Sequence, residues 1–308
     1  MASEAYFDNM VFKTIYSFHM PLFMIISGYL FAFSAAKGTW KTTVSKKVKS
    51  VLIPLLLWSL ISFIIKLASG QLPMTMFGLA KGYLRTSVVS LWFLWAVLLC
   101  SVFVSFVRYF LKDNIVIYAA VFAVSFVIPD FFSTELFKFM YPYFVLGYFA
   151  GKSGGYKVSN RFINTAWIVS GVLFVGLLCF YNYDSYIYTS KFCIMQGSVF
   201  ERLGTDIYRF AIGFAGCVFV IISVSKLTVL LKGKAAKLVS QIGMNTMGIY
   251  ILSVYINEYI LPTTTYKQQG ASCLPLIIET VCVTAVCMAV IKLIKKSKTL
   301  NKYLLGGR

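Results

Sequence analysis

The chain has 308 residues, of which 59% are hydrophobic and only 13% are charged. A soluble domain is closer to half apolar and a quarter charged, so the composition excludes an ordinary soluble protein and indicates several membrane spans. The formal net charge of +19 is explained by the basic loops on one side of the predicted spans, described below. It therefore requires no nucleic-acid partner. The seven cysteines form no CxxC pair and there is one histidine, so the sequence predicts no metal site.

The first predicted span, residues 14–35, contains the single histidine, His19. The apolar run that starts at Ile15 is about 22 residues or about 33 Å of helix, which is enough to cross a bilayer core of about 30 Å. An ionisable side chain near the end of a membrane helix is costly and usually faces a cavity. Because imidazole titrates near neutral pH, His19 is a candidate general base. Packing against a neighbouring helix is the alternative.

Eight further apolar runs complete an all-α, polytopic transmembrane bundle of nine predicted spans. These runs lie at residues 50–68, 90–110, 114–129, 136–151, 163–181, 205–225, 239–261 and 272–294. The polar stretch at residues 71–90 predicts a short interfacial helix or a re-entrant segment between the second and third spans. We find no period that would indicate internal repeats.

The loops between the nine predicted spans separate the charges by sign. One side receives 20 of the 29 basic residues and a single acidic residue, Asp113, whereas the other side receives the remaining nine acidic residues. The positive-inside rule then predicts an outside N-terminus and a cytoplasmic C-terminus, in the plasma or inner membrane, with some attraction to anionic lipid. An outside N-terminus so close to the first span predicts one further helix upstream of Met1.

Five segments, in order, resemble motifs of the membrane acyltransferase-3 family, in its polysaccharide O-acetyltransferase and fucose 4-O-acetylase-like branch. The most specific is FHMPLFMIISGYLF (Phe18 to Phe31), which is similar to the signature of the family's second helix. The others are KKVKSVLIPLLLWSL (Lys46 to Leu60), LWFLWAVLL (Leu91 to Leu99), YPYFVLGYFAGK (Tyr141 to Lys152) and IGMNTMGIYIL (Ile242 to Leu252). The resemblance covers nearly the whole chain and implies one integral-membrane acyltransferase domain over residues 1–308.

The chain departs from the family pattern in two places. Family members usually have ten core helices, and the first carries an arginine and a histidine held to be catalytic. That helix is missing from this sequence, in agreement with the predicted topology, so the domain is expected to be N-terminally truncated. The family often ends the last motif with a histidine, where this chain has Ser253. An inactive fragment, or a partner of a complete paralogue, is therefore an alternative.

The resemblance implies transfer of an acyl group, usually acetyl, from a cytoplasmic coenzyme A thioester. The implied acceptor is a hydroxyl of a cell-surface or exported glycan or of a lipid-linked sugar, so acetyl-CoA, this acceptor and membrane lipid are the expected partners. A transporter or flippase for a lipid-linked saccharide is the alternative from another class of function. Its usual signature of repeated halves is not evident in this sequence.

Two further charged residues are candidate catalytic groups beside His19. Arg209, at the outer start of the seventh span, could stabilise an oxyanion or hold a phosphate. It could equally pair with Asp206 or extend to the interface. Glu279 lies about two turns inside the last span, where a carboxylate needs a partner. Arg209, Lys66 and His19 are the candidates for that partner.

The candidate substrate-binding residues are hydroxyl, aromatic and basic side chains near the predicted ends of spans. Ser27 and its neighbour Gly28 also permit close helix packing, and an aromatic belt also explains the tryptophans and tyrosines. The aromatic segment 181–202 is a candidate lid over the acceptor, and the inner lysines at 37–49 and 232–237 could attract phosphates of coenzyme A. The substrate-binding set is Ser27, Tyr29, Lys66 and Trp92.

Overall fold

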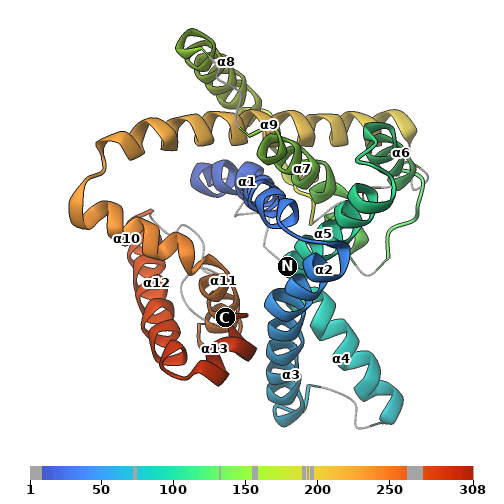
Figure 1. Ribbon diagram of the computed structural model, residues 1–308, viewed down its shortest axis with the longest axis vertical. Helices are drawn as coiled ribbons and strands as arrows, with labels where there is room; N and C mark the ends of the chain where they lie inside the picture. The colour runs from blue at the N-terminus through green and yellow to red at the C-terminus, as the bar shows by residue number, and fades with distance from the viewer. Residues whose placement is uncertain are drawn as a thin grey trace. The chain divides into compact units, whose positions relative to one another are not determined.

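A computed structural model gives the structure of the chain. It describes residues 9–71, 75–131, 133–154, 159–188, 192, 194, 198–261 and 273–307. Over these residues the regular elements are all helices and no strand occurs (Figure 1), which confirms the all-α prediction. The chain divides into two compact units, which are described separately. The first comprises Met1–Ser45 and Ala96–Leu230, and the second Lys46–Trp95 and Leu231–Arg308.

The first unit is built on two helices that lie side by side, α1 (Met10–Ala36) and α7 (Thr134–Lys152) (Figure 1). Glycines bring their backbones into contact. A Cβ atom added to Gly28 would collide with the backbone of α7, and one added to Gly147 would collide with the backbone of α1. Small residues allow this close approach between membrane helices, and the packing role predicted for Gly28 is confirmed.

A long helix, α9 (Val199–Leu230), contacts both α1 and α8 (Asn160–Leu178). The remaining helices of this unit are α2 (Trp40–Lys47), α5 (Trp92–Phe110) and α6 (Ile115–Ser125), of which α2 and α5 cross the boundaries between the units. A buried apolar cluster fills the space between α8 and α9. Its members are Phe174, Leu178, Tyr181, Ile212 and Ala215.

A tight turn between α5 and α6 is fastened by Asp113. Lys112 and Asp113 have left-handed backbone angles, with φ of 52° and 55°. The Asp113 carboxylate accepts hydrogen bonds from Tyr118 (2.9 Å), Tyr148 (2.9 Å) and Lys152 (2.7 Å). Burial by itself would raise the pKa of Asp113, but these three donors outweigh burial and hold that pKa below its usual value. The turn is thereby joined to α7.

A continuous helix runs from α2 through a π-helical turn, η2 (Val48–Leu52), into α3 (Ile53–Ala68), and the second unit contains its part from Lys46 onwards. Its other elements are α4 (Met76–Ser90), α10 (Gly233–Met244), α11 (Thr246–Tyr255), the π-helical turn η4 (Ile256–Ile260), α12 (Cys273–Lys296) and α13 (Lys298–Leu304). The C-terminal end packs on α3, where the Trp58 indole donates a hydrogen bond of 2.9 Å to the Leu304 carbonyl. Gly306, with a φ of +63°, leaves no room for a side chain beside the backbone of Ser50.

All nine predicted spans fall on helices, and six helices in the described part are long and apolar enough to cross a membrane. The multi-pass prediction is confirmed. The fourth predicted span, 114–129, is an 11-residue helix that ends at Ser125. Pro129 explains the early end, because proline and the residue before it disfavour helix. The helical part of this segment is therefore about 17 Å long, shorter than a bilayer core of about 30 Å. The eighth predicted span, 239–261, is interrupted at Asn245.

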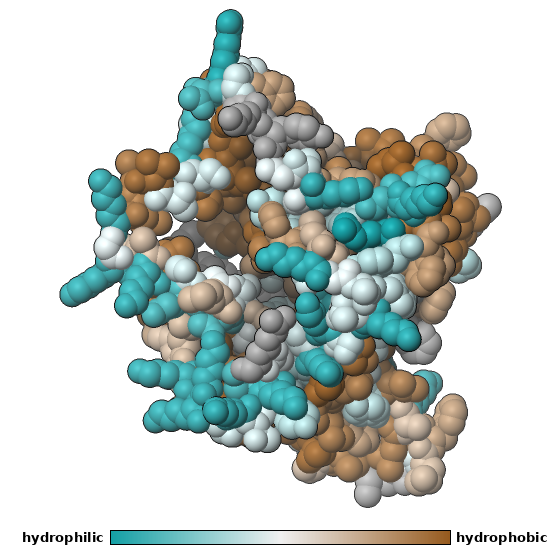
Figure 2. Space-filling model, in the orientation of Figure 1, coloured by the Kyte–Doolittle hydropathy of each residue, from teal (hydrophilic) through white to brown (hydrophobic). Residues whose placement is uncertain are grey.

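Apolar side chains on the outside of several helices agree with contact to lipid. On α8, for example, Val172 is 71% exposed. Figure 2 shows hydrophobic surface over much of the visible face and hydrophilic side chains gathered in separate areas. Residues 76–90, predicted as an interfacial or re-entrant segment, form the helix α4, whose first residues Met76 and Phe77 are largely exposed.

Candidate active site

His19 lies on an aromatic face of α1. The helix starts at Asn9, whose side chain caps it by accepting hydrogen bonds from the next backbone amides. Phe12, Tyr16 and His19 follow at spacings of four and three residues and therefore share one face. The Tyr16 ring stacks on Phe12 at 4.1 Å between centroids and meets the edge of the His19 ring at 4.7 Å.

The hydrogen bond of His19 determines which ring nitrogen carries the proton. Nδ1 lies 2.8 Å from the carbonyl oxygen of Ile15, one turn earlier in the helix. A carbonyl only accepts hydrogen bonds, so Nδ1 is the donor and, in the neutral ring, Nε2 keeps its lone pair. Within the described residues Nε2 has no hydrogen-bond partner. This half-buried imidazole is thus prepared to accept a proton at Nε2.

A segment that follows α8 brings two more tyrosines to this face. Tyr186 meets Phe12 at 5.7 Å and Tyr16 at 5.6 Å between ring centroids, and it also contacts Tyr188 at 4.9 Å. Burial raises the pKa of Tyr186, so its phenol stays protonated and can donate a hydrogen bond. We name Phe12, Tyr16, Tyr186 and Tyr188 the aromatic patch. Tyr16 and Tyr188 are about two-fifths exposed, so the patch is open beside His19.

Arg209 holds this segment in place. Its Nε donates to the Ser185 carbonyl (2.9 Å) and its Nη2 to the Asp184 carbonyl (2.7 Å), immediately before Tyr186. Its Nη1 pairs with Asp206 at 2.7 Å, and both side chains are buried. The pairing that the sequence left open is therefore present, and Arg209 positions the aromatic patch. The second carboxylate oxygen of Asp206 is buried without a hydrogen-bond partner among the described residues.

The sequence reasoning missed a second buried ion pair, which is formed by Lys138 and Asp130. Lys138 Nζ is 2.6 Å from Asp130 Oδ1, and Asp130 Oδ2 accepts a hydrogen bond of 2.7 Å from the backbone amide of Phe192. The available signal was a lysine inside a predicted span, because such a residue requires a partner. The pair joins the start of α7 to Phe192, in the chain between α8 and α9.

The two substrate-binding residues predicted on α1 are not gathered around His19. Ser27 and Tyr29 follow it by eight and ten residues, or about 12 and 15 Å along the helix axis. Ser27 is half-buried, and Tyr29 is 41% exposed and meets Phe33 at 5.1 Å between ring centroids. They therefore lie more than two helical turns from His19 along α1.

The remaining predicted site residues belong to the second unit. Lys66 forms an ion pair of 2.9 Å with Glu258, and Trp92 is buried with its ring 6.0 Å from that of Phe93. Glu279 is half-buried on α12 and forms no ion pair within the described part. Arg209 and Lys66, two of the three partners predicted for Glu279, form ion pairs with Asp206 and Glu258.

Comparison with known proteins identifies the family. A family model described as an acyltransferase domain matches residues 2–295. The chain belongs to the acyltransferase-3 family. The curated relatives include the nodulation protein NolL of Mesorhizobium japonicum, 28% identical over 193 residues that cover 61% of this chain and 51% of the relative. NolL of Sinorhizobium fredii is 29% identical over 185 residues, which cover 58% and 50%.

The chain spans about half the length of these curated relatives. No solved structure matches it. The family predicted from the five sequence motifs is confirmed by a match that runs through both compact units.

Proposed function

We propose that this chain is a membrane O-acyltransferase, and more specifically an O-acetyltransferase that uses acetyl-CoA and a glycan acceptor. The observation that carries the proposal is the family match over residues 2–295. Because that match runs through both units, we treat residues 1–308 as one functional domain. The acceptor is a hydroxyl of a cell-surface or exported glycan.

His19 is the proposed general base. The acceptor hydroxyl loses its proton to Nε2 of His19 while its oxygen forms a bond to the thioester carbonyl carbon. The carbon–sulfur bond breaks, the thiolate leaves, and the proton on the imidazole is returned to the sulfur or to solvent. Support comes from the Nδ1 hydrogen bond to Ile15, because it leaves Nε2 as the accepting nitrogen.

The aromatic patch is the proposed acceptor surface. Tyrosine rings offer apolar faces to sugar rings and hydroxyls to their polar edges. Tyr16 is exposed beside His19, and Tyr188, which contacts Tyr186 of the same patch, is exposed as well. Arg209 holds the adjoining segment through the Asp184 and Ser185 carbonyls. Arg209 is therefore proposed as a positioning residue. Glu279, Ser27, Tyr29, Lys66 and Trp92 stay candidates that contribute elsewhere along the path of the acyl group.

The proposed orientation in the plasma or inner membrane is the one that the charge distribution predicts. Lysine-rich loops face the cytoplasm and the His19 end of α1 faces outwards. The donor is cytoplasmic and the glycan lies at or beyond the outer face. The acyl end of the donor, still bound as a thioester, therefore has to reach His19 through the helix bundle before transfer.

The test compares native protein with His19→Ala and His19→Gln in cells that make the glycan and lack their own copy. We expect ester-linked acetate on the purified glycan to fall about 100-fold or more, the range for loss of a general base. Leu30→Ala is the matched control, because Leu30 is an exposed residue of the same helix. Equal acetylation at equal protein amounts would remove His19 from the mechanism. Labelled acetyl-CoA left unconsumed by the native protein would favour a transporter instead.

A further inference from the structure

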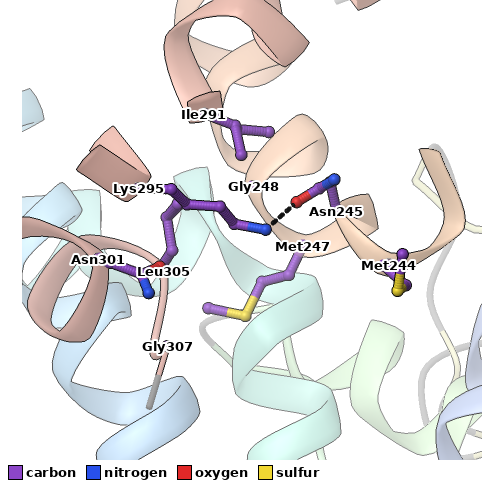
Figure 3. A pocket seen from close by; sticks show the side chains of 9 residues that line it. All are labelled: Met244, Asn245, Met247, Gly248, Ile291, Lys295, Asn301, Leu305 and Gly307. Atoms are coloured by element: carbon purple, nitrogen blue, oxygen red, sulfur yellow. Dashed lines mark hydrogen bonds between the residues drawn. The ribbon is translucent and has the colours of Figure 1, made fainter. Parts of the chain in front are cut away.

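A pocket of about 200 Å³ opens in the second unit, where the break between α10 and α11 meets the end of α12 and the C-terminal residues (Figure 3). Nothing in the proposed reaction uses it. It is smaller than the pockets of about 300–1,000 Å³ that enclose a whole drug-sized ligand, so it suits a headgroup-sized fragment. The lining residues are Met244, Asn245, Met247, Gly248, Ile291, Lys295, Asn301, Leu305 and Gly307.

Lys295 supplies the charge of this pocket. In Figure 3 its side chain extends towards Asn245, and its Nζ donates a hydrogen bond of 2.6 Å to Asn245 Oδ1. An ammonium group has three donors, so two are available beyond this bond. Asn301, on the facing side of the pocket, adds an amide. The side chains of Met247 and Leu305 give the pocket an apolar part as well.

No aspartate or glutamate in the flanking sequence compensates this charge. Residues 233–257 and 280–307 contain seven lysines and no aspartate or glutamate. The only two acidic residues after residue 231 are Glu258, which pairs with Lys66, and Glu279, about four turns of α12 before Lys295. Figure 2 shows hydrophilic side chains gathered where Figure 1 draws the end of α12 and α13. A cavity lined by one sign of charge concentrates ions of the opposite sign.

We propose that this pocket binds the phosphate of an amphiphilic phosphate ester, with Lys295 and Asn301 as donors to the phosphate oxygens. The methionine and leucine side chains contact the apolar part of the same ligand. Two sources carry this chemistry: the headgroup of an anionic lipid, and coenzyme A with its phosphates. In its coenzyme A form the inference rests on the proposed function, whereas in its lipid form it does not.

The experiment measures binding without turnover on the full chain purified in neutral detergent. One arm titrates coenzyme A by calorimetry at about 0.1 M salt. The other arm compares nanodiscs of phosphatidylcholine with nanodiscs that also contain phosphatidylglycerol, and counts retained phosphatidylglycerol by native mass spectrometry. Lys295→Gln removes the charge, and Asn245→Asp places a carboxylate against Lys295 with almost no change of shape. Lys298→Gln is the control, because this nearby lysine does not line the pocket.

We expect Lys295→Gln and Asn245→Asp each to weaken the binding of one of the two ligands about tenfold or more, as for the loss of a charge-assisted hydrogen bond. Lys298→Gln should change it less than twofold, and thermal midpoints should stay close to that of the native chain. A coenzyme A effect identifies a donor site, and a phosphatidylglycerol effect identifies a lipid site. The proposal is overturned if the native chain retains neither ligand, or if Lys298→Gln weakens binding as much as Lys295→Gln. A lipid result would stand even if the chain transferred no acetyl group.

Discussion

Replacement of Gly147 by alanine tests the backbone contact between α1 and α7. The added Cβ would lie 2.7 Å from the carbonyl carbon of Ile25 and 2.9 Å from its Cα atom. Carbon atoms without a bond between them need about 3.5 Å, so these contacts alone require a separation of about 0.8 Å. The Ile25 carbonyl oxygen lies closer still, so the two helices must separate by more than this. The obstructing atoms belong to the backbone and cannot rotate away. We expect a loss of about 1–3 kcal/mol of stability, the usual cost of overpacking.

The assay is thermal unfolding of the detergent-solubilised chain, followed by circular dichroism. Gly176→Ala on α8 is the matched control, since no atom lies within 4 Å of the Cβ that it would add. In a helix interior that change should be neutral or stabilising by up to about 1 kcal/mol. If Gly147→Ala unfolds at a temperature no lower than that of the native chain, α1 and α7 do not touch as described. Because α1 also carries His19, we expect Gly147→Ala to lower acetylation as well.

Two further predictions concern buried charges. Asp113→Asn should unfold at a lower temperature at neutral pH. In the native chain the lowered pKa of Asp113 contributes stability above about pH 4, and this stability is lost as the pH falls through the folded-state pKa. The melting temperatures of the mutant and native chains should therefore converge at low pH. A constant difference from pH 3 to 7 would contradict this. Arg209→Gln leaves Asp206 buried and unpaired, which should cost about 3–5 kcal/mol. It should also speed hydrogen exchange in residues 181–188, whereas Lys226→Gln, on the exposed part of the same helix, should leave exchange unchanged.

The sequence predicts the helices well because each apolar run must satisfy its own backbone inside a bilayer. The same reasoning places the end of a helix poorly where the break is local. The early end of α6 before Pro129 and the interruption at Asn245 both lie inside runs that read as continuous by hydropathy. Proline was the visible signal in the first case. Asn245, whose side chain donates to the Gln241 carbonyl, has no equivalent signal in the sequence.

The candidate site shows the same division between near and distant contacts. The pairing of Asp206 with Arg209 joins residues three apart on one helix, and the sequence included it as an alternative. The bonds from Arg209 to the Asp184 and Ser185 carbonyls depend on how an irregular segment folds back, which no periodicity encodes. For the same reason the sequence explained the tyrosines by an aromatic belt, although Tyr186 packs against Tyr16, which contacts His19.

The partner of His19 within α1 has a consequence for any movement of that helix. An imidazole that is oriented by a residue from another part of the fold, as in a serine–histidine–aspartate triad, loses its alignment when the two parts separate. Here the orienting oxygen belongs to Ile15, four residues earlier in the same helix. The nitrogen that we propose as the proton acceptor would therefore keep its orientation relative to α1 in any movement of that helix.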